Sequence, residues 1–246
     1  MKPLIRLTLT ETKLFLREPM AWMFILGFPP VLMIIFGLIP PFREPQEEFG
    51  GARIIDLYAP IMVAIAITVF ALSSFPQYFV TYREKGVLRR LRVTPVKPST
   101  MLSAQLLMSL VFALVVSLVI LGIARFAFEV ALPQNVPGYA TAFLLCSTAM
   151  FAVGLLVASL MPTGTATGAI GTILLFPMMF FAGLWIPRDA MNDVLRTVSD
   201  FTPLGAGVQS LQDATAGDWP QLLHLLVMLA WTVAAGALAV RYFRWE

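Results

Sequence analysis

Five long stretches without a charged residue constrain this chain more than any other feature of its sequence. They cover residues 19–42, 57–82, 98–124, 130–187 and 219–240, and their lengths are 24, 26, 27, 58 and 22 residues. A helix needs about 20 apolar residues to cross the hydrocarbon core of a bilayer. The 58-residue run has room for two such helices, separated by a break at Met161–Gly168 that contains proline and glycine. The sequence therefore predicts an all-α membrane protein with six transmembrane helices.

The expected organisation is a single transmembrane domain over residues 1–246, in which 59% of the residues are hydrophobic and 13% are charged. The six spans are expected at about 20–40, 57–80, 99–124, 139–161, 168–186 and 219–240. Residues 1–18 carry four basic residues at helical spacing, which predicts an N-terminal interfacial helix, with an ordinary solvated helix as the alternative. Residues 187–218 contain two short amphipathic patterns, which favour an outer re-entrant hairpin over a loose loop.

The distribution of basic residues predicts the orientation of the chain in the membrane. If the N-terminus, the loop 81–98, the turn 162–168 and the C-terminus face one side, that side carries 12 Lys and Arg residues and the other side carries 5. Cytoplasmic loops are enriched in Lys and Arg. We therefore expect a multi-pass protein of the plasma membrane with both termini in the cytoplasm.

Several functions are disfavoured by what the sequence lacks. None of the four lysines follows a glycine, so a phosphate-binding loop of the Gly-Lys-Ser/Thr type is missing. His224 has no cysteine or acidic residue at ligand spacing, and we expect no metal and no cofactor in this chain. The predicted spans contain no Asp, Glu, Lys or Arg, which argues against proton-coupled carriers, ion channels and intramembrane enzymes. The remaining class moves an apolar molecule with energy supplied by another protein.

A basic loop separates the second and third predicted spans. Residues 83–97 hold six of the 17 Lys and Arg residues of the chain and one acid, Glu84. If residues 84–92 form a helix, leucines lie on one face and cations on another, a pattern that fits a groove on a soluble partner. Contact with lipid headgroups alone is the alternative interpretation.

The sequence of this loop resembles the cytoplasmic-loop signature of the ABC type-2 exporter permeases. That signature reads Arg-Glu-x-Gly-x-Leu-x-x-Leu-x-x-Thr-Pro, and its positions are occupied here by Arg83, Glu84, Gly86, Leu88, Leu91, Thr94 and Pro95. A second stretch, Phe180–Pro187 followed by Phe201–Leu204, is similar to the end of the fifth span and the outer hairpin of that family. The likeness extends over essentially the whole chain.

The resemblance implies a permease in a bacterial plasma membrane that pairs with a second permease, identical or homologous, and with two separate ATP-binding subunits. ATP and magnesium would bind those subunits, this chain would contact membrane lipids, and nucleic acid would play no part. The resemblance also implies that the basic loop is a coupling helix. Its ATPase-contacting residues would be Arg83, Glu84, Lys85, Gly86, Leu88, Arg89, Leu91, Arg92, Thr94 and Pro95. Of these residues, Glu84 is the one most expected to contact the ATPase, because a lone acid in a basic loop indicates a specific partner.

The resemblance further implies a transport path lined by the second and fifth spans. The residues expected to line it are Thr68, Ser73, Phe75, Tyr78, Phe176, Met179 and Phe180. Methionine and phenylalanine adapt to varied apolar ligands, although packing or lipid contact explains each residue equally well. Three glycines at the start of the fifth span, Gly164, Gly168 and Gly171, would serve either a dimer seam or packing within the chain.

The function that follows from the resemblance is export of an amphipathic drug-like molecule, a lipid or a natural product, driven by ATP hydrolysis on separate subunits. Export of a lipid-linked polysaccharide and a non-transporting membrane scaffold are the alternatives. The chain itself is not expected to be an enzyme.

Overall fold

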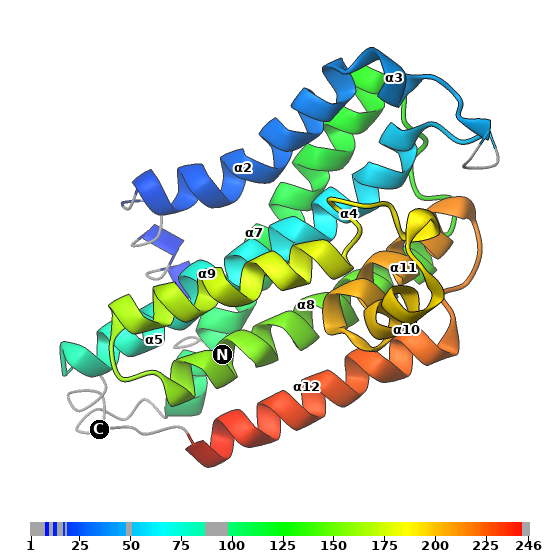
Figure 1. Cartoon of the computed structure of the whole chain (residues 1–246). Helices are drawn as coiled ribbons and strands as arrows, with labels where there is room; N and C mark the ends of the chain where they lie inside the picture. The colour runs from blue at the N-terminus through cyan, green and yellow to red at the C-terminus, as the bar shows by residue number, and fades with distance from the viewer. Residues whose placement is uncertain are drawn as a thin grey trace.

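The computed structural model describes residues 8–9, 12–13, 17, 19–47, 51–86 and 98–242, and this part of the chain contains helices and one isolated β-bridge, between Pro45 and Arg53. Its elements are α2 (Pro19–Leu38), α3 (Pro40–Arg43), α4 (Ile54–Val69), η2 (Phe70–Ser74), α5 (Phe75–Glu84), α7 (Pro98–Phe128), α8 (Val136–Leu160), α9 (Gly164–Phe181), η3 (Arg188–Ala190), α10 (Asp193–Phe201), α11 (Pro203–Ala216) and α12 (Leu222–Tyr242). Figure 1 shows them as one elongated bundle.

Helices occupy the places of all six predicted spans. Five helical stretches in the described residues are long and apolar enough to cross a membrane: Ile54–Glu84, Ser103–Phe128, Val136–Leu160, Gly164–Phe181 and Leu222–Tyr242. The first predicted span corresponds to α2, a helix of 20 residues that is not among these five. The chain is thus a multi-pass helical membrane protein, and the count of six spans stays a prediction. The predicted interfacial helix, residues 1–18, lies mostly outside the described residues.

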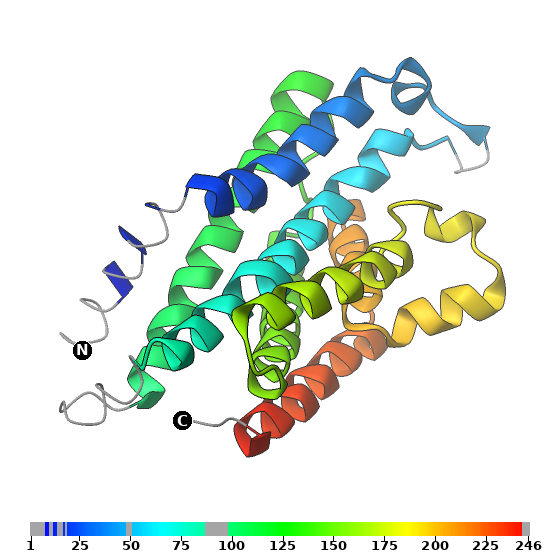
Figure 2. The ribbon, with the colours of Figure 1, turned by 60° about the vertical axis from the view of Figure 1, so that its left-hand side comes forward.

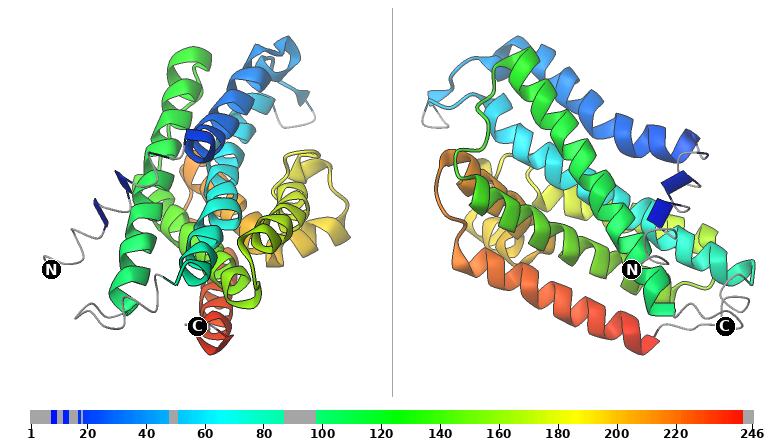
Figure 3. Two further views of the ribbon diagram at one scale, coloured as in Figure 1. Left: turned by 90° about the vertical axis from the view of Figure 1, so that its left-hand side faces the viewer. Right: turned by 180° about the vertical axis from the view of Figure 1, so that it is seen from behind.

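The second predicted span is the central element of the bundle. α4, η2 and α5 form one continuous helical rod from Ile54 to Glu84, and most of its surface is buried. α8 lies beside this rod and packs against α11 and α12, whereas α2 and α7 pack against α4. Figures 2 and 3 show α7, α9 and α12 at the periphery, where most of their apolar surface is exposed. In a membrane, that surface is available to lipid or to a partner chain.

The bundle has two ends, which we name after one residue each. The Glu84 end holds the last turn of α5, the turn between α8 and α9, and the last turn of α12 (Figure 1). The Asp200 end holds α3, α10 and the first turns of α8 and α12 (Figure 1). The charge distribution of the sequence predicts that the Glu84 end faces the cytoplasm.

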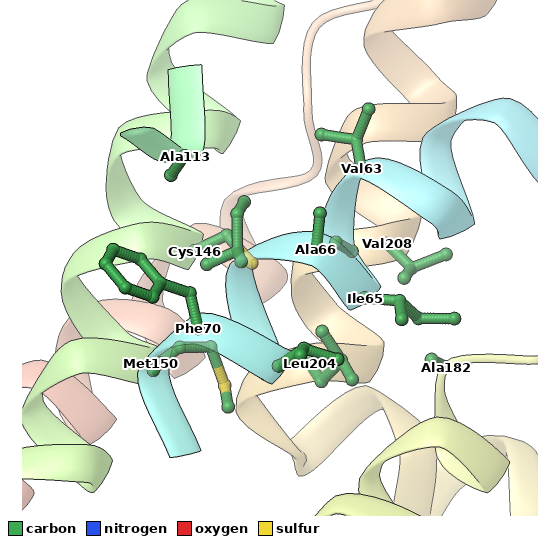
Figure 4. Packing of buried hydrophobic residues seen from close by; sticks show 14 of the residues in the cluster. Val63, Ile65, Ala66, Phe70, Ala113, Cys146, Met150, Ala182, Leu204 and Val208 are labelled. Atoms are coloured by element: carbon green, nitrogen blue, oxygen red, sulfur yellow. The ribbon is translucent and has the colours of Figure 1, made fainter. Parts of the chain in front are cut away.

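Apolar side chains from η2, α8 and α11 meet in the core. Figure 4 shows Phe70 near Met150 and Cys146, with Leu204 and Val208 close by. Each of these five residues is at most 1% exposed. The free cysteine is therefore a small packing residue in the fourth predicted span.

A π-helical turn interrupts the central rod. In η2, which covers Phe70–Ser74, the N–H of Phe75 bonds to the carbonyl of Phe70. Pro76 follows, and because proline has no N–H it cannot donate to the carbonyl of Leu72 or to that of Ala71. The wider π turn accommodates the proline, and these two carbonyl groups lie against glycines of neighbouring helices.

The region predicted as an outer hairpin forms two helices that meet at Thr202. The apolar face predicted for the second of them is fully buried, since Leu204, Val208 and Leu211 have no exposed surface. In the first apolar pattern, by contrast, Val194 and Val198 are 72% and 43% exposed, whereas Met191, just before α10, is buried. Entry of this hairpin into the membrane stays a prediction.

Two buried tyrosines provide a paired test of the core. Tyr58 donates a hydrogen bond of 2.9 Å to the carbonyl of Leu184, whereas the hydroxyl of Tyr139 has no partner among the described residues. We expect Tyr58→Phe to lower the free energy of unfolding by about 1 kcal/mol, and Tyr139→Phe to leave it unchanged or raise it. Denaturation of the purified protein in detergent measures both values. Equal losses in the two variants would contradict this assignment.

Candidate functional site

The end of α5 is bonded to the turn between α8 and α9. The guanidinium group of Arg83 donates to the backbone carbonyl of Met161 and, at 3.2 Å, to that of Pro162. The carboxylate of Glu84 accepts the N–H of Gly164 at 3.2 Å. The first two residues of the predicted coupling loop thus hold a turn that lies 78 to 80 residues further along the chain.

These bonds satisfy polar groups that the two helices leave open. Gly164 is the first residue of α9, and the first N–H groups of a helix have no acceptor within it. Thr163 accepts the N–H of Ala166 at 3.2 Å, and Glu84 accepts that of Gly164. The positive end of the helix dipole favours a carboxylate here. Because the turn itself contains no acidic residue, the N-terminus of α9 uses an acceptor from the second span.

The other predicted coupling residues divide into two groups. Lys85 is exposed and Gly86 is half-buried at the end of α5. The remaining six lie outside the described residues: Leu88, Arg89, Leu91, Arg92, Thr94 and Pro95. Contact of this loop with an ATPase therefore stays a prediction, and the partner that the structure gives Glu84 belongs to its own chain.

The seven residues predicted to line a transport path do not share one surface. Three of them are buried in the core, namely Thr68, Phe75 and Met179. Three more are half-buried, namely Ser73, Tyr78 and Phe180. Phe176 on α9 is 56% exposed. Of the seven, Phe176 is thus the one that presents most of its side chain to the surroundings of this chain.

The three glycines of α9 pack against the central rod. A Cβ atom on Gly171 would lie closer than 3.0 Å to the carbonyl oxygen of Leu72. A Cβ atom on Gly168 would also lie closer than 3.0 Å to the side-chain amide of Gln77. Gly164 faces the last turns of α5. Of the two roles predicted for these glycines, the structure shows packing within the chain.

The π turn is held between glycines from two helices. The carbonyl of Leu72 faces Gly171 of α9, and the carbonyl of Ala71 faces Gly154 of α8. A Cβ atom on Gly154 would also lie closer than 3.0 Å to the oxygen that it faces. Glycine permits this close approach of two backbones because it has no side chain. The central rod is therefore clamped between α8 and α9 at the point where its hydrogen-bond pattern changes.

A polar cluster that the sequence did not reveal lies at the Asp200 end. Asp200 of α10 accepts a hydrogen bond from Arg188 and lies 3.0 Å from Nε2 of His224 in α12. Arg188 also donates to Ser199 at 2.9 Å, and Ser199 donates to the carbonyl of Phe181 at 2.7 Å. The side chains of Arg188 and His224 are only 9% and 3% exposed. The cluster therefore joins the ends of α9, α10 and α12.

His224 has an acidic neighbour that its spacing in the sequence did not indicate. That neighbour, Asp200, is 24 residues away in the chain and approaches only when the segment between α9 and α12 folds. A recess of about 280 Å³ lies beside the pair, and Arg188, Arg196 and Gln209 also line it. Within the described residues, no three His, Cys, Asp or Glu side chains form a group that could hold a metal ion.

The ABC-2 type transporter family matches residues 4–215, which is most of the chain. The chain therefore belongs to the ABC-2 type transporter family, and it is a membrane-spanning permease subunit of an ABC transporter. Permeases of this family normally work with ATP-binding subunits. A comparison with curated proteins gives no match.

Proposed function

We propose that this chain is the permease of an ATP-driven exporter, which moves an amphipathic drug-like molecule, a lipid or a natural product out of the cytoplasm. The exporter contains two separate ATP-binding subunits, to which the basic loop of this chain docks, and a second permease, identical or homologous, completes the path. The observation that carries this proposal is the bonding of Arg83 and Glu84 to the turn between α8 and α9. That bonding links the predicted docking loop to a second membrane helix. ATP and magnesium stay on the partner subunits.

The apolar nature of the cargo is inferred from the membrane helices. No charged residue lies within 57–82 or 130–187, so the second and fifth predicted spans offer hydroxyl, aromatic and thioether groups to a ligand. Such adaptable side chains suit apolar ligands of varied shape. Phe176, exposed on α9, is accessible to a cargo or a second permease. Phe75 and Met179, which are buried, become accessible only after α5 or α9 moves.

The orientation follows from the same proposal. Six spans with both termini in the cytoplasm, in a bacterial plasma membrane, place the Glu84 end beside the ATP-binding subunits. The hairpin of α10 and α11 then lies at the outer mouth of the path. There the Asp200 cluster supports the ends of α9, α10 and α12.

Co-purification from the native host tests the partnership. We expect an ATP-binding subunit to remain bound to the tagged wild-type chain. The double variant Arg89→Glu with Arg92→Glu is expected to retain at least about tenfold less of it, because two attractive contacts with carboxylates become repulsive. Arg125→Glu reverses an exposed charge near the Asp200 end and is the matched control. A wild-type chain that retains no ATP-binding subunit would contradict the proposed function.

A non-transporting scaffold would also bind the ATP-binding subunit, so a second measurement separates the two functions. The purified complex is reconstituted into liposomes with a panel of fluorescent amphipathic dyes and fluorescent lipids. We expect movement of at least one probe across the membrane that requires ATP and stops with vanadate. Binding of the subunit without movement of any probe would favour a scaffold.

A further inference from the structure

The two ends of the basic loop are attached to different groups of helices. Before the loop, α5 packs against α8 and α9. After the loop, α7 packs mainly against α2 and α4. The two groups meet at η2, where the hydrogen-bond pattern of the central rod changes. A force applied to the loop therefore acts on both groups, and π turns are a common place for a helix to bend.

Two sets of contacts join α5 to its own group. In η2, directly before α5, the carbonyls of Ala71 and Leu72 lie against Gly154 and Gly171. At the Glu84 end, Arg83 and Glu84 hold the turn that joins α8 to α9. The first set fixes α5 laterally and the second fixes the base of α9 to it. With both in place, α9 follows the end of α5 when the loop moves.

Glu84 is already engaged within the chain. Its Oε1 accepts the N–H of Gly164, and its Oε2 lies close to the same residue, 3.7 Å from where a Cβ atom would be. Arg83 uses its guanidinium group on the carbonyls of Met161 and Pro162. Glu84 is exposed and Arg83 is half-buried, yet the polar groups of both already have partners within the chain.

We propose that Arg83 and Glu84 are positioning residues that transmit movement of the coupling loop to α9, and that they do not themselves contact the ATPase. This inference rests on the proposed function and changes one part of it, because the resemblance to the permease family assigns Glu84 to the ATPase contact. The ATPase contact then falls to the cationic residues further along the loop, such as Arg89 and Arg92.

The experiment measures movement of α9 without needing to know the cargo. Spin labels are placed at Ala169 on α9 and Val240 on α12, which are both exposed. The labelled chain is diluted with unlabelled copies in the complex with its ATP-binding subunit. The distance between the labels is compared before and after trapping with ATP and vanadate. The wild type is expected to show a shift in this distance.

Four variants separate transmission from docking. Glu84→Ala and Arg83→Ala are expected to keep the ATP-binding subunit bound while the shifted population falls about tenfold, the size expected from loss of one charged hydrogen bond. Glu84→Gln keeps an amide oxygen for the Gly164 N–H, and its shift is expected to stay within about twofold of the wild type. Glu47→Ala removes an exposed acid from the loop between α3 and α4 and controls for net charge.

Three results would overturn the inference. A full shift in Glu84→Ala would show that the contact transmits nothing. Loss of the ATP-binding subunit from Glu84→Ala, with retention of its helical circular dichroism, would return Glu84 to the docking surface. A wild-type chain that binds no ATP-binding subunit would overturn the proposed function together with this inference, which distinguishes the two failures.

Discussion

Replacing Gly171 with alanine is expected to destabilise the protein strongly. The new Cβ atom would lie closer than 3.0 Å to the carbonyl oxygen of Leu72, which is backbone and cannot rotate away. Overpacking of a tight core costs about 1–3 kcal/mol, and we expect the upper end because both sides of the contact are main chain. For a chain of this size the unfolding temperature would fall by about 6–12 °C. Gly154→Ala, against Ala71, should behave alike.

Two other glycines provide the matched controls for this prediction. Gly122 in α7 and Gly236 in α12 have no described atom within 4 Å of the place where a Cβ atom would be. Alanine is the better helix former, so Gly122→Ala and Gly236→Ala should be neutral or stabilise the protein by up to about 1 kcal/mol. Thermal unfolding of all four variants, followed by gel filtration in detergent, measures the contrast. Tolerance of Gly171→Ala at the level of Gly236→Ala would refute the clamp at the π turn.

The second large effect is expected at the Asp200 cluster. Asp200→Ala would leave the guanidinium group of Arg188 and the ring of His224 without their shared acceptor, although both side chains are nearly buried. Removal of one partner from a buried ion pair costs about 3–5 kcal/mol, because the remaining charge stays buried. We expect a loss of about 3 kcal/mol, since Asp200 itself is 22% exposed. Asp200→Asn keeps an acceptor oxygen and should lose less.

A double-mutant cycle decides whether the loss at Asp200 comes from the pairing itself. If Arg188 and Asp200 act as a unit, Arg188→Ala combined with Asp200→Ala should cost clearly less than the sum of the two single variants. Free energies of unfolding in denaturant provide the three values. Simple addition of the two losses would mean that the short contact between these side chains contributes nothing to stability.

The positions of the membrane helices could be predicted from the sequence because charged residues are excluded from hydrocarbon. The uncharged runs therefore mark the spans directly, and α4 to α5, α7, α8, α9 and α12 all lie within or across them. The ends of the helices are predicted less accurately than their positions. α9 begins at Gly164, four residues before the predicted start of the fifth span, because Thr163 and Glu84 cap it there.

Side-chain partners depend on tertiary packing, and the sequence predicted few of them. The isolation of Glu84 among cations predicts a contact with an ATPase, which stays a prediction, whereas its hydrogen bond with the N–H of Gly164 could not be predicted from the sequence. His224 and Asp200 come together from two different helices, and no periodicity in the sequence connects them. The burial of the residues predicted to line the transport path also depends on tertiary packing. Spacing along the spans could not tell buried Phe75 from exposed Phe176.

The long separation between the tied residues has a consequence for how the protein is made. Arg83 and Glu84 leave the ribosome 78 to 80 residues before Met161 and Gly164. Domains form progressively during synthesis, N-terminal parts first. The first turn of α9 contains no acidic residue. When α9 is synthesised, the carboxylate of Glu84 that caps it is already present in the chain. The order of synthesis therefore makes the capping group of α9 available before α9 itself forms.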